Sequence, residues 1–299
     1  MSIVKSFSVN NGDMFYIKHG SDNFTIIDCH LDNDNRDRIL KELGEQWKDK
    51  EIIRVIITHP DEDHILGLKD LNKKNSILNF YCTENNATKE EETESFKFYC
   101  EMRDGDKAYF LEKDCSRKYM NKSGKDKDGN VIGSSGINIL WPDVNNKDYK
   151  DALKISADGG NANNICPIIK YSLEDGVKIL WFGDLETDFF DKIEDEVDWE
   201  SADIIFAPHH GRSSGRIPSS ILGKIDPKII IVGEADSKDL EYYKGYNTIT
   251  QNSAGDITLD CEEDKVHIYC SNKDYSVNFL DNLNKKSFNY YIGSLSTGE

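Results

Sequence analysis

The side chains with the clearest capacity for chemistry lie in segment 59–64, which reads HPDEDH and directly follows an apolar, β-branched run. Alternate residues of an extended stretch point the same way, so His59, Asp61 and Asp63 can converge, and His64 adds a second imidazole. Two imidazoles and two carboxylates form a ligand set that suits zinc, iron or manganese. A polar loop that caps a helix is the alternative, but it does not explain why a buried strand delivers four ligand-type side chains. We therefore predict that this segment binds metal.

Two later apolar runs end in side chains of the same kind. The run VKILWF ends just before a Gly and Asp184, and the run DIIFA is followed by PHHG at 208–211. Asp184 can bridge two cations, although capping the helix that follows is its alternative role. Since successive side chains diverge, we assign the metal ligand to His210 and predict His209 as an acid or oxyanion stabiliser. Chemistry collects beyond the carboxyl ends of strands in α/β sheets, so these residues are expected to meet at one site.

The elements that must position these residues alternate between strand and helix patterns, which predicts an α/β fold. A helical spacing of apolar residues covers 36–47. The runs typical of strands are 14–17, 24–27, 52–57, 137–141, 177–182, 203–207, 228–232, 257–259 and 266–269. We predict one domain over residues 1–270, in which the charged stretch 84–135 forms a surface insertion. A polar tail is expected at 271–299.

The motifs together resemble the metallo-β-lactamase superfamily, whose hallmark after a buried strand is H-x-H-x-D-H. Here Asp61 replaces the middle histidine, which gives H-x-D-x-D-H. This variant resembles the soluble hydrolase domain of ComEC-type competence proteins over about residues 7–270. The further motifs that carry the resemblance are Gly12-Asp13, Ile26-Ile27-Asp28, Ile139-Leu140-Trp141-Pro142, Phe182-Gly183-Asp184, Pro208-His209-His210-Gly211 and Gly255-Asp256-Ile257-Thr258-Leu259.

The resemblance implies an αββα four-layer sandwich and a hydrolase with one or two divalent ions, zinc or manganese. It also implies phosphodiester hydrolysis by metal-activated water, with a nucleic acid or a nucleotide as substrate. One cation would be held by His59, Asp61 and Asp184, and the other by Asp63, His64, Asp184 and His210. Asp61, Asp63 and His209 form the predicted catalytic set, in which Asp63 orients the nucleophile. The chain lacks the membrane channel of the competence proteins, so DNA uptake does not carry over.

Several residues outside the ligand set are expected to support it. Asp28 ends a strand and fits a group that orients a ligand histidine, with a turn residue as the alternative. Asn163-Asn164 stands where the superfamily usually has a histidine, and Asn164 is either a weak metal ligand or a substrate contact, with a loop turn as the alternative. Arg212, Ser213 and Ser214 could offer a guanidinium and hydroxyls to a phosphate, whereas a flexible loop is the alternative.

Composition narrows the function further. The formal net charge of −18 repels polyanions on average, so a nucleic-acid substrate must be drawn in by the metals or by a local basic patch. No apolar stretch approaches the length of a membrane span, and the seven cysteines show no framework spacing, so we expect a cytoplasmic protein without membrane contact. The sequence does not identify protein partners. The alternatives are a hydrolase of a lactone, thioester or other carboxyl ester, a phosphocholine-esterase-like enzyme, and a non-catalytic binding module.

Overall fold

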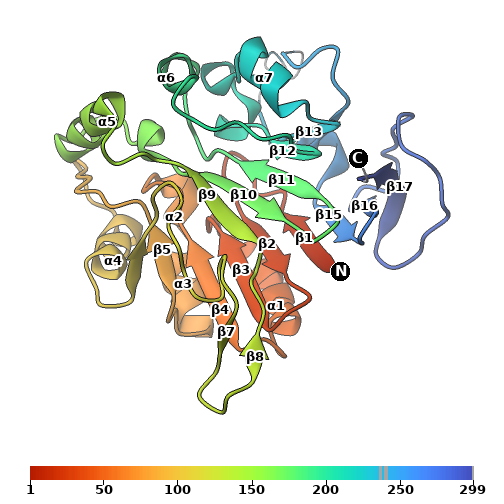
Figure 1. Ribbon diagram of the computed structural model, residues 1–299, viewed down its shortest axis with the longest axis horizontal. Coiled ribbons are helices and arrows are strands. Elements are labelled where there is room, and N and C mark those ends of the chain that lie inside the picture. The colour runs from red at the N-terminus through yellow and green to blue at the C-terminus, as the bar shows by residue number, and fades with distance from the viewer. Residues whose placement is uncertain (236–237, 239–241, 298–299) are drawn as a thin grey trace.

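The molecule consists of two facing β-sheets, each covered on its outer side by helices (Figure 1). The structure is a computed structural model that describes residues 1–235, 238 and 242–297. An apolar core fills the space between the sheets, and a further apolar cluster lies under the helices on each outer face. The layers therefore follow the order α, β, β, α. The predicted αββα sandwich is confirmed.

The first sheet has the strand order β17-β16-β15-β1-β2-β3-β4-β5-β6. It is parallel from β3 to β6 and antiparallel elsewhere. The strand bounds are β1 Ser2–Ser6, β2 Phe15–Lys18, β3 Asn23–Ile27, β4 Ile52–Ile56, β5 Phe80–Cys82, β6 Ala108–Phe110, β15 Ile257–Cys261, β16 Lys265–Cys270 and β17 Tyr290–Ser296.

The second sheet has the order β14-β13-β12-β11-β10-β9. It is parallel from β11 to β14, and β10 is antiparallel to both of its neighbours, β9 and β11. The strand bounds are β9 Ile137–Trp141, β10 Ile168–Ser172, β11 Lys178–Trp181, β12 Ile204–Phe206, β13 Ile229–Val232 and β14 Thr248–Thr250. A separate hairpin pairs β7, Gly124–Lys125, with β8, Val131–Ile132.

The longer helices bury apolar side chains against the outer faces of the sheets. Residues of α1, α3 and α4 pack on the first sheet, and residues of α5, α6 and α7 pack on the second. The helix bounds are α1 Arg36–Gln46, α2 Glu62–Ile65, α3 Leu68–Lys74, α4 Glu94–Arg103, α5 Lys147–Ala157, α6 Thr187–Ile193, α7 Ser219–Ile225 and α8 Gln251–Ala254, with 3-10 turns η1 Asn163–Ile165, η2 His209–Gly211 and η3 Ser213–Gly215. Within 1–235 and 242–297, a helix with the length and apolarity needed to cross a bilayer is not found.

The core between the sheets explains why the strands read as continuous apolar runs. Phe15 of the first sheet packs edge-on against Trp181 and Phe206 of the second, which stack on each other with ring centroids 5.1 Å apart. A strand covered on one face by the opposite sheet and on the other by helices presents no face to water, so alternation with polar residues is lost. These contacts fix the two sheets relative to each other.

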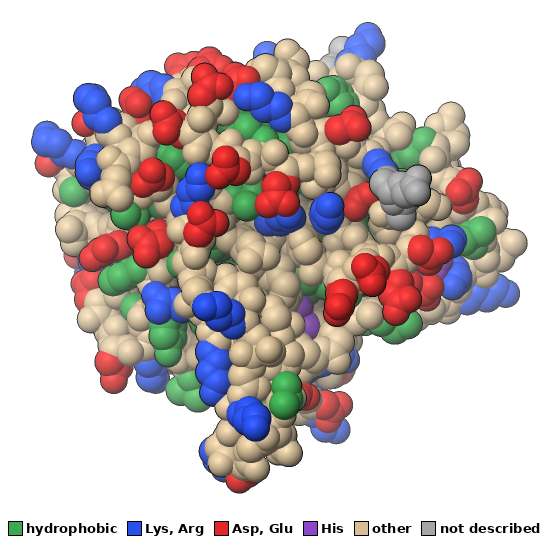
Figure 2. Space-filling view, in the orientation of Figure 1, with side chains coloured by type: hydrophobic (Ala, Val, Ile, Leu, Met, Phe, Trp, Pro, Cys, Tyr) green, Lys and Arg blue, Asp and Glu red, His purple; other side chains and the backbone are tan. Residues whose placement is uncertain are grey.

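Two segments that were expected to lie outside the core contribute strands to the first sheet. Residues 84–135, expected to form a surface insertion, include α4 and strand β6 as well as the β7–β8 hairpin. Several Lys and Arg side chains line this hairpin at the bottom of Figure 2, and basic and acidic side chains are mixed over the rest of the visible face. Beyond residue 270, where a polar tail was expected, β17 pairs with β16; residues 298 and 299 lie outside the described residues.

Candidate metal centre

The carboxyl end of β4 delivers the first group of candidate ligands. The strand ends at Ile56, and Thr58 and His59 follow it. Asp61 is the extended residue that precedes α2, and the single turn of this helix brings His64 back into the interior. The short helix α2, which directly follows the buried strand β4, therefore brings His64 back beside His59.

The carboxyl end of β11 delivers Asp184, which is buried. Gly183 makes this approach feasible, because it has a φ of 54°, and a Cβ added there would lie 2.7 Å from Cys166 Sγ and 2.9 Å from Thr58 Cβ. The backbone N–H of Asp184 donates to Cys166 Sγ at 3.3 Å. Asp184 is thus brought within reach of the β4 loop of the opposite sheet.

The carboxyl end of β12 delivers two histidines in an uncommon backbone conformation. His209 and His210 have φ values of 51° and 56°, and Gly211 follows with a φ of 89°. Left-handed conformations at residues other than glycine typically cost about 1–3 kcal/mol each and cluster at functional sites. The backbone N–H of His209 donates to the Gly183 carbonyl at 3.0 Å, which ties this turn to the loop that carries Asp184.

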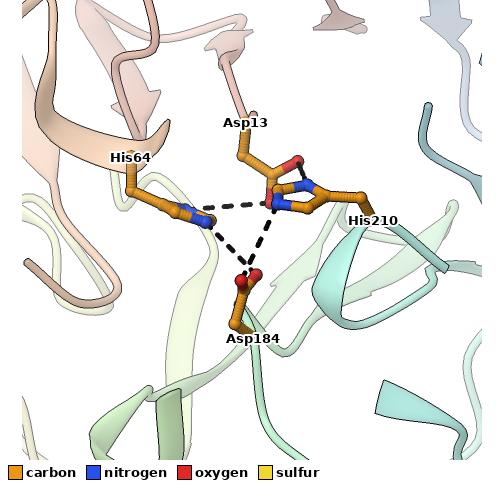
Figure 3. A group of neighbouring side chains, drawn as sticks. All are labelled: Asp13, His64, Asp184 and His210. Atoms are coloured by element: carbon orange, nitrogen blue, oxygen red, sulfur yellow. Dashed lines mark hydrogen bonds and ion pairs between the residues drawn. The ribbon is translucent and has the colours of Figure 1, made fainter. Parts of the chain in front are cut away.

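Four side chains from both sheets meet in a compact group (Figure 3). Ligand atoms of Asp13, His64, Asp184 and His210 all lie within 4.8 Å of one another. His64 Nε2 is 3.2 Å from Asp184 Oδ1, and His210 Nε2 is 3.7 Å from Asp184 Oδ2. This group could hold a divalent cation, since imidazole nitrogens and carboxylate oxygens are the donors of zinc and related sites.

The hydrogen bonds show which face of each imidazole is available. His64 Nδ1 lies 2.9 Å from Asp28 Oδ2, and His59 Nδ1 lies 3.2 Å from Thr58 Oγ1. His210 Nδ1 lies 3.1 Å from Asp13 Oδ1. These contacts orient the rings, as partners of ligating histidines do.

The opposite ring nitrogens are left for a ligand. Within the described residues, the Nε2 atoms of His59, His64 and His210, together with Asp184 Oδ1, are buried and have no hydrogen-bond partner. Buried polar atoms without partners are costly, and at one point in space they indicate a bound group. The donor set therefore fits a metal ion.

Asp63 and Asp13 approach the cluster from different sides. The two carboxylate oxygens of Asp63 lie 3.4 Å from His210 Nε2 and 4.0 Å from His64 Nε2. Asp13 instead contacts Nδ1 of both rings, at 3.1 Å and 4.0 Å. The unpartnered nitrogens therefore face Asp63 and Asp184, whereas Asp13 is placed to orient the rings.

His59 and Asp61 form a smaller group beside this cluster. His59 Nε2 is 3.6 Å from Asp61 Oδ2 and 3.9 Å from Asp184 Oδ2. The other oxygen of Asp61 forms an ion pair with the ammonium group of Lys89, which comes from the loop between β5 and α4. Asp61 thus has one oxygen directed at the imidazole and the other paired with an ammonium group.

The charges of the centre shift the pKa values of its members in opposite directions. Burial alone would lower the pKa values of His64 and His210, but the Asp184 carboxylate and the second carboxylate beside each ring raise that of His64 well above its ordinary value and that of His210 to about 10. Burial would raise the pKa of Asp184, yet the charges of His64 and His210 hold it well below its usual range. Similar contacts lower the pKa of Asp63 to about 2 against the effect of burial. The carboxylates are therefore ionised and attract positive charge, which a metal ion can supply.

His209, Arg212 and Ser214 form a segment, termed the arm, whose imidazole reaches Asp184. His209 Nε2 is 3.6 Å from Asp184 Oδ2 and 3.3 Å from Arg212 Nη1, and its Nδ1 is 2.9 Å from Ser214 Oγ. Burial lowers the pKa of His209, despite the nearby Asp184 carboxylate, so its imidazole is neutral at pH 7. The arm is fixed to the start of α6, because Thr187 Oγ1 contacts the carbonyls of Ser214 and Arg216.

The structure brings together most of the residues predicted from the sequence. Those gathered at the centre or in contact with it are Asp28, His59, Asp61, Asp63, His64, Asp184, His209, His210, Arg212 and Ser214. Ser213 lies in the same arm, on the surface. Asn164 is directed elsewhere: its amide donates to Glu186 at 2.8 Å and its oxygen accepts from the Glu186 backbone at 3.1 Å.

One geometric expectation from the sequence does not hold. The side chains of His209 and His210 were expected to diverge, but both Nε2 atoms lie within 4 Å of Asp184 Oδ2. The reason is that both residues adopt left-handed φ values, so the alternation of an extended strand does not apply. The buried position of His210, whose Nδ1 is held by Asp13, favours it as the ligand, because Arg212 occupies the Nε2 side of His209.

Sequence reasoning assigned no role to three residues at the centre. Asp13 lies in the β1–β2 loop, and the Gly12-Asp13 pair was noticed only as part of a resemblance. A Cβ on Gly12 would lie 2.7 Å from the Asp63 carbonyl oxygen, so a glycine there permits the close approach of the two loops. The roles of Thr58 and Lys89 could not be predicted from the sequence, because a threonine at a strand end and a lysine in an acidic loop are both common.

A comparison with known families adds an independent observation. Residues 8–114 match the family model of the metallo-beta-lactamase superfamily. Among curated proteins, none matches this chain. The matched segment contains Asp13, Asp28 and the 59–64 motif, while Asp184 and His210 come from the second sheet. The superfamily consists mainly of metal-dependent hydrolases, and together with the His/Asp cluster the match indicates a metal-dependent hydrolase.

Proposed function

We propose that this protein is a metal-dependent phosphodiesterase that acts on nucleic acid or a nucleotide. The observation that carries the proposal is the arm of His209, Arg212 and Ser214, in which a guanidinium and a hydroxyl contact the imidazole whose Nε2 lies 3.6 Å from Asp184 Oδ2. A guanidinium matches the geometry of a phosphate and is of less use to a neutral lactone or thioester. The resemblance of the H-x-D-x-D-H variant to the competence-protein hydrolase domain supports the same class of reaction.

The residues proposed to hold the metal are those that face the unpartnered imidazole nitrogens. His64 and His210 would each supply Nε2, and Asp63 and Asp184 would supply carboxylate oxygens. A bound divalent cation lowers the pKa of water to near neutrality and neutralises charge that develops on the substrate. Asp28 and Asp13 would keep the Nδ1 protons of the two imidazoles in place, so that both Nε2 lone pairs are available.

Asp63, besides its proposed role as a ligand, would act on the attacking water, and the residues of the arm would act on the substrate. Asp63 is ionised at neutral pH and could accept a hydrogen bond from the attacking water, which orients the water for in-line attack. Arg212 would bind a non-bridging phosphate oxygen. Once Arg212 turns from His209 Nε2 to the phosphate, and with Ser214 donating to Nδ1, the neutral imidazole of His209 would carry its proton on Nε2 and stabilise the developing negative charge through that N–H.

The net charge of −18 bears on the size of the substrate. A long duplex would bring many phosphates against an acidic surface, whereas a nucleotide or a short single strand brings only a few to the arm and the metal. We therefore propose short phosphodiesters as the preferred substrates. Salt dependence of KM tests this point, because a substrate with few phosphate contacts has a shallow slope of log KM against log salt.

The decisive experiment compares substrate classes on the manganese- or zinc-loaded protein. We expect hydrolysis of bis-p-nitrophenyl phosphate and of a short single-stranded oligonucleotide, and no comparable turnover of a lactone, a thioester or p-nitrophenyl phosphorylcholine. The Asp184→Asn variant should abolish turnover. Preferential hydrolysis of the lactone or the thioester would refute the proposed substrate class, and a metal-loaded protein inert towards all substrates would indicate a binding module.

A pair of arginine variants tests the role of the arm. A charge-assisted hydrogen bond contributes about 1.5–3 kcal/mol, so Arg212→Gln should lower kcat/KM for the phosphodiester by about 10- to 100-fold. Arg216→Gln is the matched control, because Arg216 follows in the same segment but stacks over the Tyr242 ring at 4.6 Å. Equal losses in both variants would contradict a specific contact between Arg212 and substrate.

A further inference from the structure

Lys89 brings an ammonium group to the edge of the candidate metal centre. Its ammonium group forms an ion pair with Asp61 Oδ1, while Asp61 Oδ2 faces His59 Nε2 at 3.6 Å. The side chains of both partners are partly exposed, 29% for Lys89 and 30% for Asp61, so the pair lies at the mouth of the buried cluster. A cation is therefore already placed at the side of the centre where His59 and Asp61 would bind one.

The loop that carries Lys89 is anchored immediately before it. The backbone N–H of Thr88 donates to the Ser156 carbonyl at 3.0 Å, and Thr88 Oγ1 donates to the Ala157 carbonyl at 2.9 Å. Both acceptors lie at the end of α5, which packs on the second sheet. The two bonds hold the backbone next to Lys89, so the ammonium is directed at Asp61 by the fold and not by a freely moving loop.

The two halves of the centre differ in what they offer a metal. The half around His64 and His210 has two unpartnered Nε2 atoms and two carboxylates, which completes a four-ligand set. The half around His59 has one unpartnered nitrogen, a carboxylate that Lys89 already engages, and a share of Asp184 at 3.9 Å. The second set is therefore the poorer site for a divalent ion.

The charge beside His59 points the same way. The Lys89 ammonium already contacts Asp61 Oδ1, so a divalent cation held by Asp61 Oδ2 and His59 Nε2 would share one carboxylate with it. Like charges this close repel, and the repulsion disfavours a second ion at this position more than an ion between His64 and His210.

We infer that the protein binds a single divalent cation between His64 and His210, and that the ammonium group of Lys89 takes the place of a second cation beside His59 and Asp61. This inference rests on the metal dependence of the proposed function but not on its substrate. In this position Lys89 can contribute the positive charge that a second metal would offer to a substrate oxygen. The centre is then mononuclear because of one residue in the loop between β5 and α4.

Metal counting tests the inference without any activity measurement. The full chain is freed of metal with a chelator, loaded with excess Mn²⁺, desalted and analysed for bound manganese by mass spectrometry and by electron paramagnetic resonance. The wild type should retain one equivalent with the six-line spectrum of an isolated ion. Lys89→Met, which keeps the length of the side chain without its charge, should retain two equivalents with the spectrum of an exchange-coupled pair.

A lysine outside the centre provides the matched control. Lys97→Met, on the exposed face of α4, should behave as the wild type. Two equivalents in the wild type, or one equivalent in a folded Lys89→Met, would overturn the inference. Lys89→Gln serves as the second variant if Lys89→Met does not fold, with the same expected count. A protein that binds one ion but hydrolyses no phosphodiester would refute the proposed function and leave this inference standing.

Discussion

Replacing Asp28 with Asn should weaken metal binding without disturbing the fold. Asp28 is buried, and its two oxygens accept three hydrogen bonds: the Thr58 N–H at 2.8 Å, the Thr58 hydroxyl at 2.8 Å and His64 Nδ1 at 2.9 Å. Asn has the same shape and tolerates the φ of 55° found here better than Ala would. The perturbation is therefore confined to the exchange of one acceptor for a donor.

That exchange acts on the tautomer of His64. If the amide keeps its oxygen on the Thr58 N–H, its NH₂ group faces His64 Nδ1, which must then accept and carry its proton on Nε2. Nε2 is the atom proposed to bind metal, so the ligand lone pair is lost. Loss of the hydrogen-bond partner of a ligating histidine typically lowers metal affinity by about 10- to 100-fold, which corresponds to about 1.4–2.8 kcal/mol of binding free energy.

Calorimetric titration with Mn²⁺ or Zn²⁺ measures this effect directly. Asp28→Asn should raise the Kd by about 10- to 100-fold, and Asp203→Asn should leave it unchanged. Asp203 is the matched control, because it is also buried and accepts a backbone N–H, from Lys178, but lies just before β12, at the opposite end of that strand from the metal centre. A Kd for Asp28→Asn indistinguishable from that of the wild type would refute the orienting role.

Three further predictions concern the protons of the ligand histidines, the buried His19 and the conformation of Gly183. Without a bound cation the pKa values of His64 and His210 are raised, so metal binding must release their protons. The Kd for metal should therefore fall as pH increases from about 6 to 8, and calorimetry in buffers of different ionisation enthalpy counts the released protons. A pH-independent Kd would contradict this reasoning. Burial, with the charges of Arg54 and Lys50, lowers the pKa of His19 well below its ordinary value, so the folded state resists a proton that the unfolded chain accepts. The free energy of unfolding should therefore decline below about pH 6.5 by up to about 1.4 kcal/mol per pH unit, and urea titrations at about pH 7 and 5 should show a smaller decline in His19→Gln. Gly183→Ala places a Cβ 2.7 Å from Cys166 Sγ at a φ of 54°. The variant should lose about 1–3 kcal/mol of unfolding free energy and bind less metal. A melting temperature and metal content equal to those of the wild type would contradict this prediction.

The parts of the site that the sequence could predict are those fixed by parallel strands. His59, Asp184 and His210 each follow an apolar run, and Asp184 and His210 leave the carboxyl ends of the adjacent parallel strands β11 and β12, so the meeting of these two needs no knowledge of loop geometry. His59 leaves β4 of the first sheet, and the packing of the two sheets brings it to the same site. The strand and helix patterns predicted an α/β fold, and the αββα layering was implied by the family resemblance that the motifs carry. Local pattern was enough wherever regular structure carried the residue.

The parts that escaped prediction depend on contacts between distant loops. Asp13 meets His210 across 197 residues, and Lys89 meets Asp61 because Thr88 is bonded to the end of α5. Neither contact leaves a periodic signal in the sequence. The strand β17 was missed for a related reason, since this seven-residue edge strand follows the polar segment 271–289 and is defined by its pairing with β16.

The division of the metal centre between the two sheets has a consequence for biosynthesis. Asp13, Asp63 and His64 belong to loops of the first sheet, whereas Asp184 and His210 extend from β11 and β12 of the second. A chain emerging from the ribosome in sequence order exposes its histidines and carboxylates long before their partners have been translated. Selective metal capture must therefore wait until His210 has left the exit tunnel and the sheets have closed. An ion bound at the proposed site would then connect the two halves of the fold and add its binding free energy to the stability of the assembled sheets.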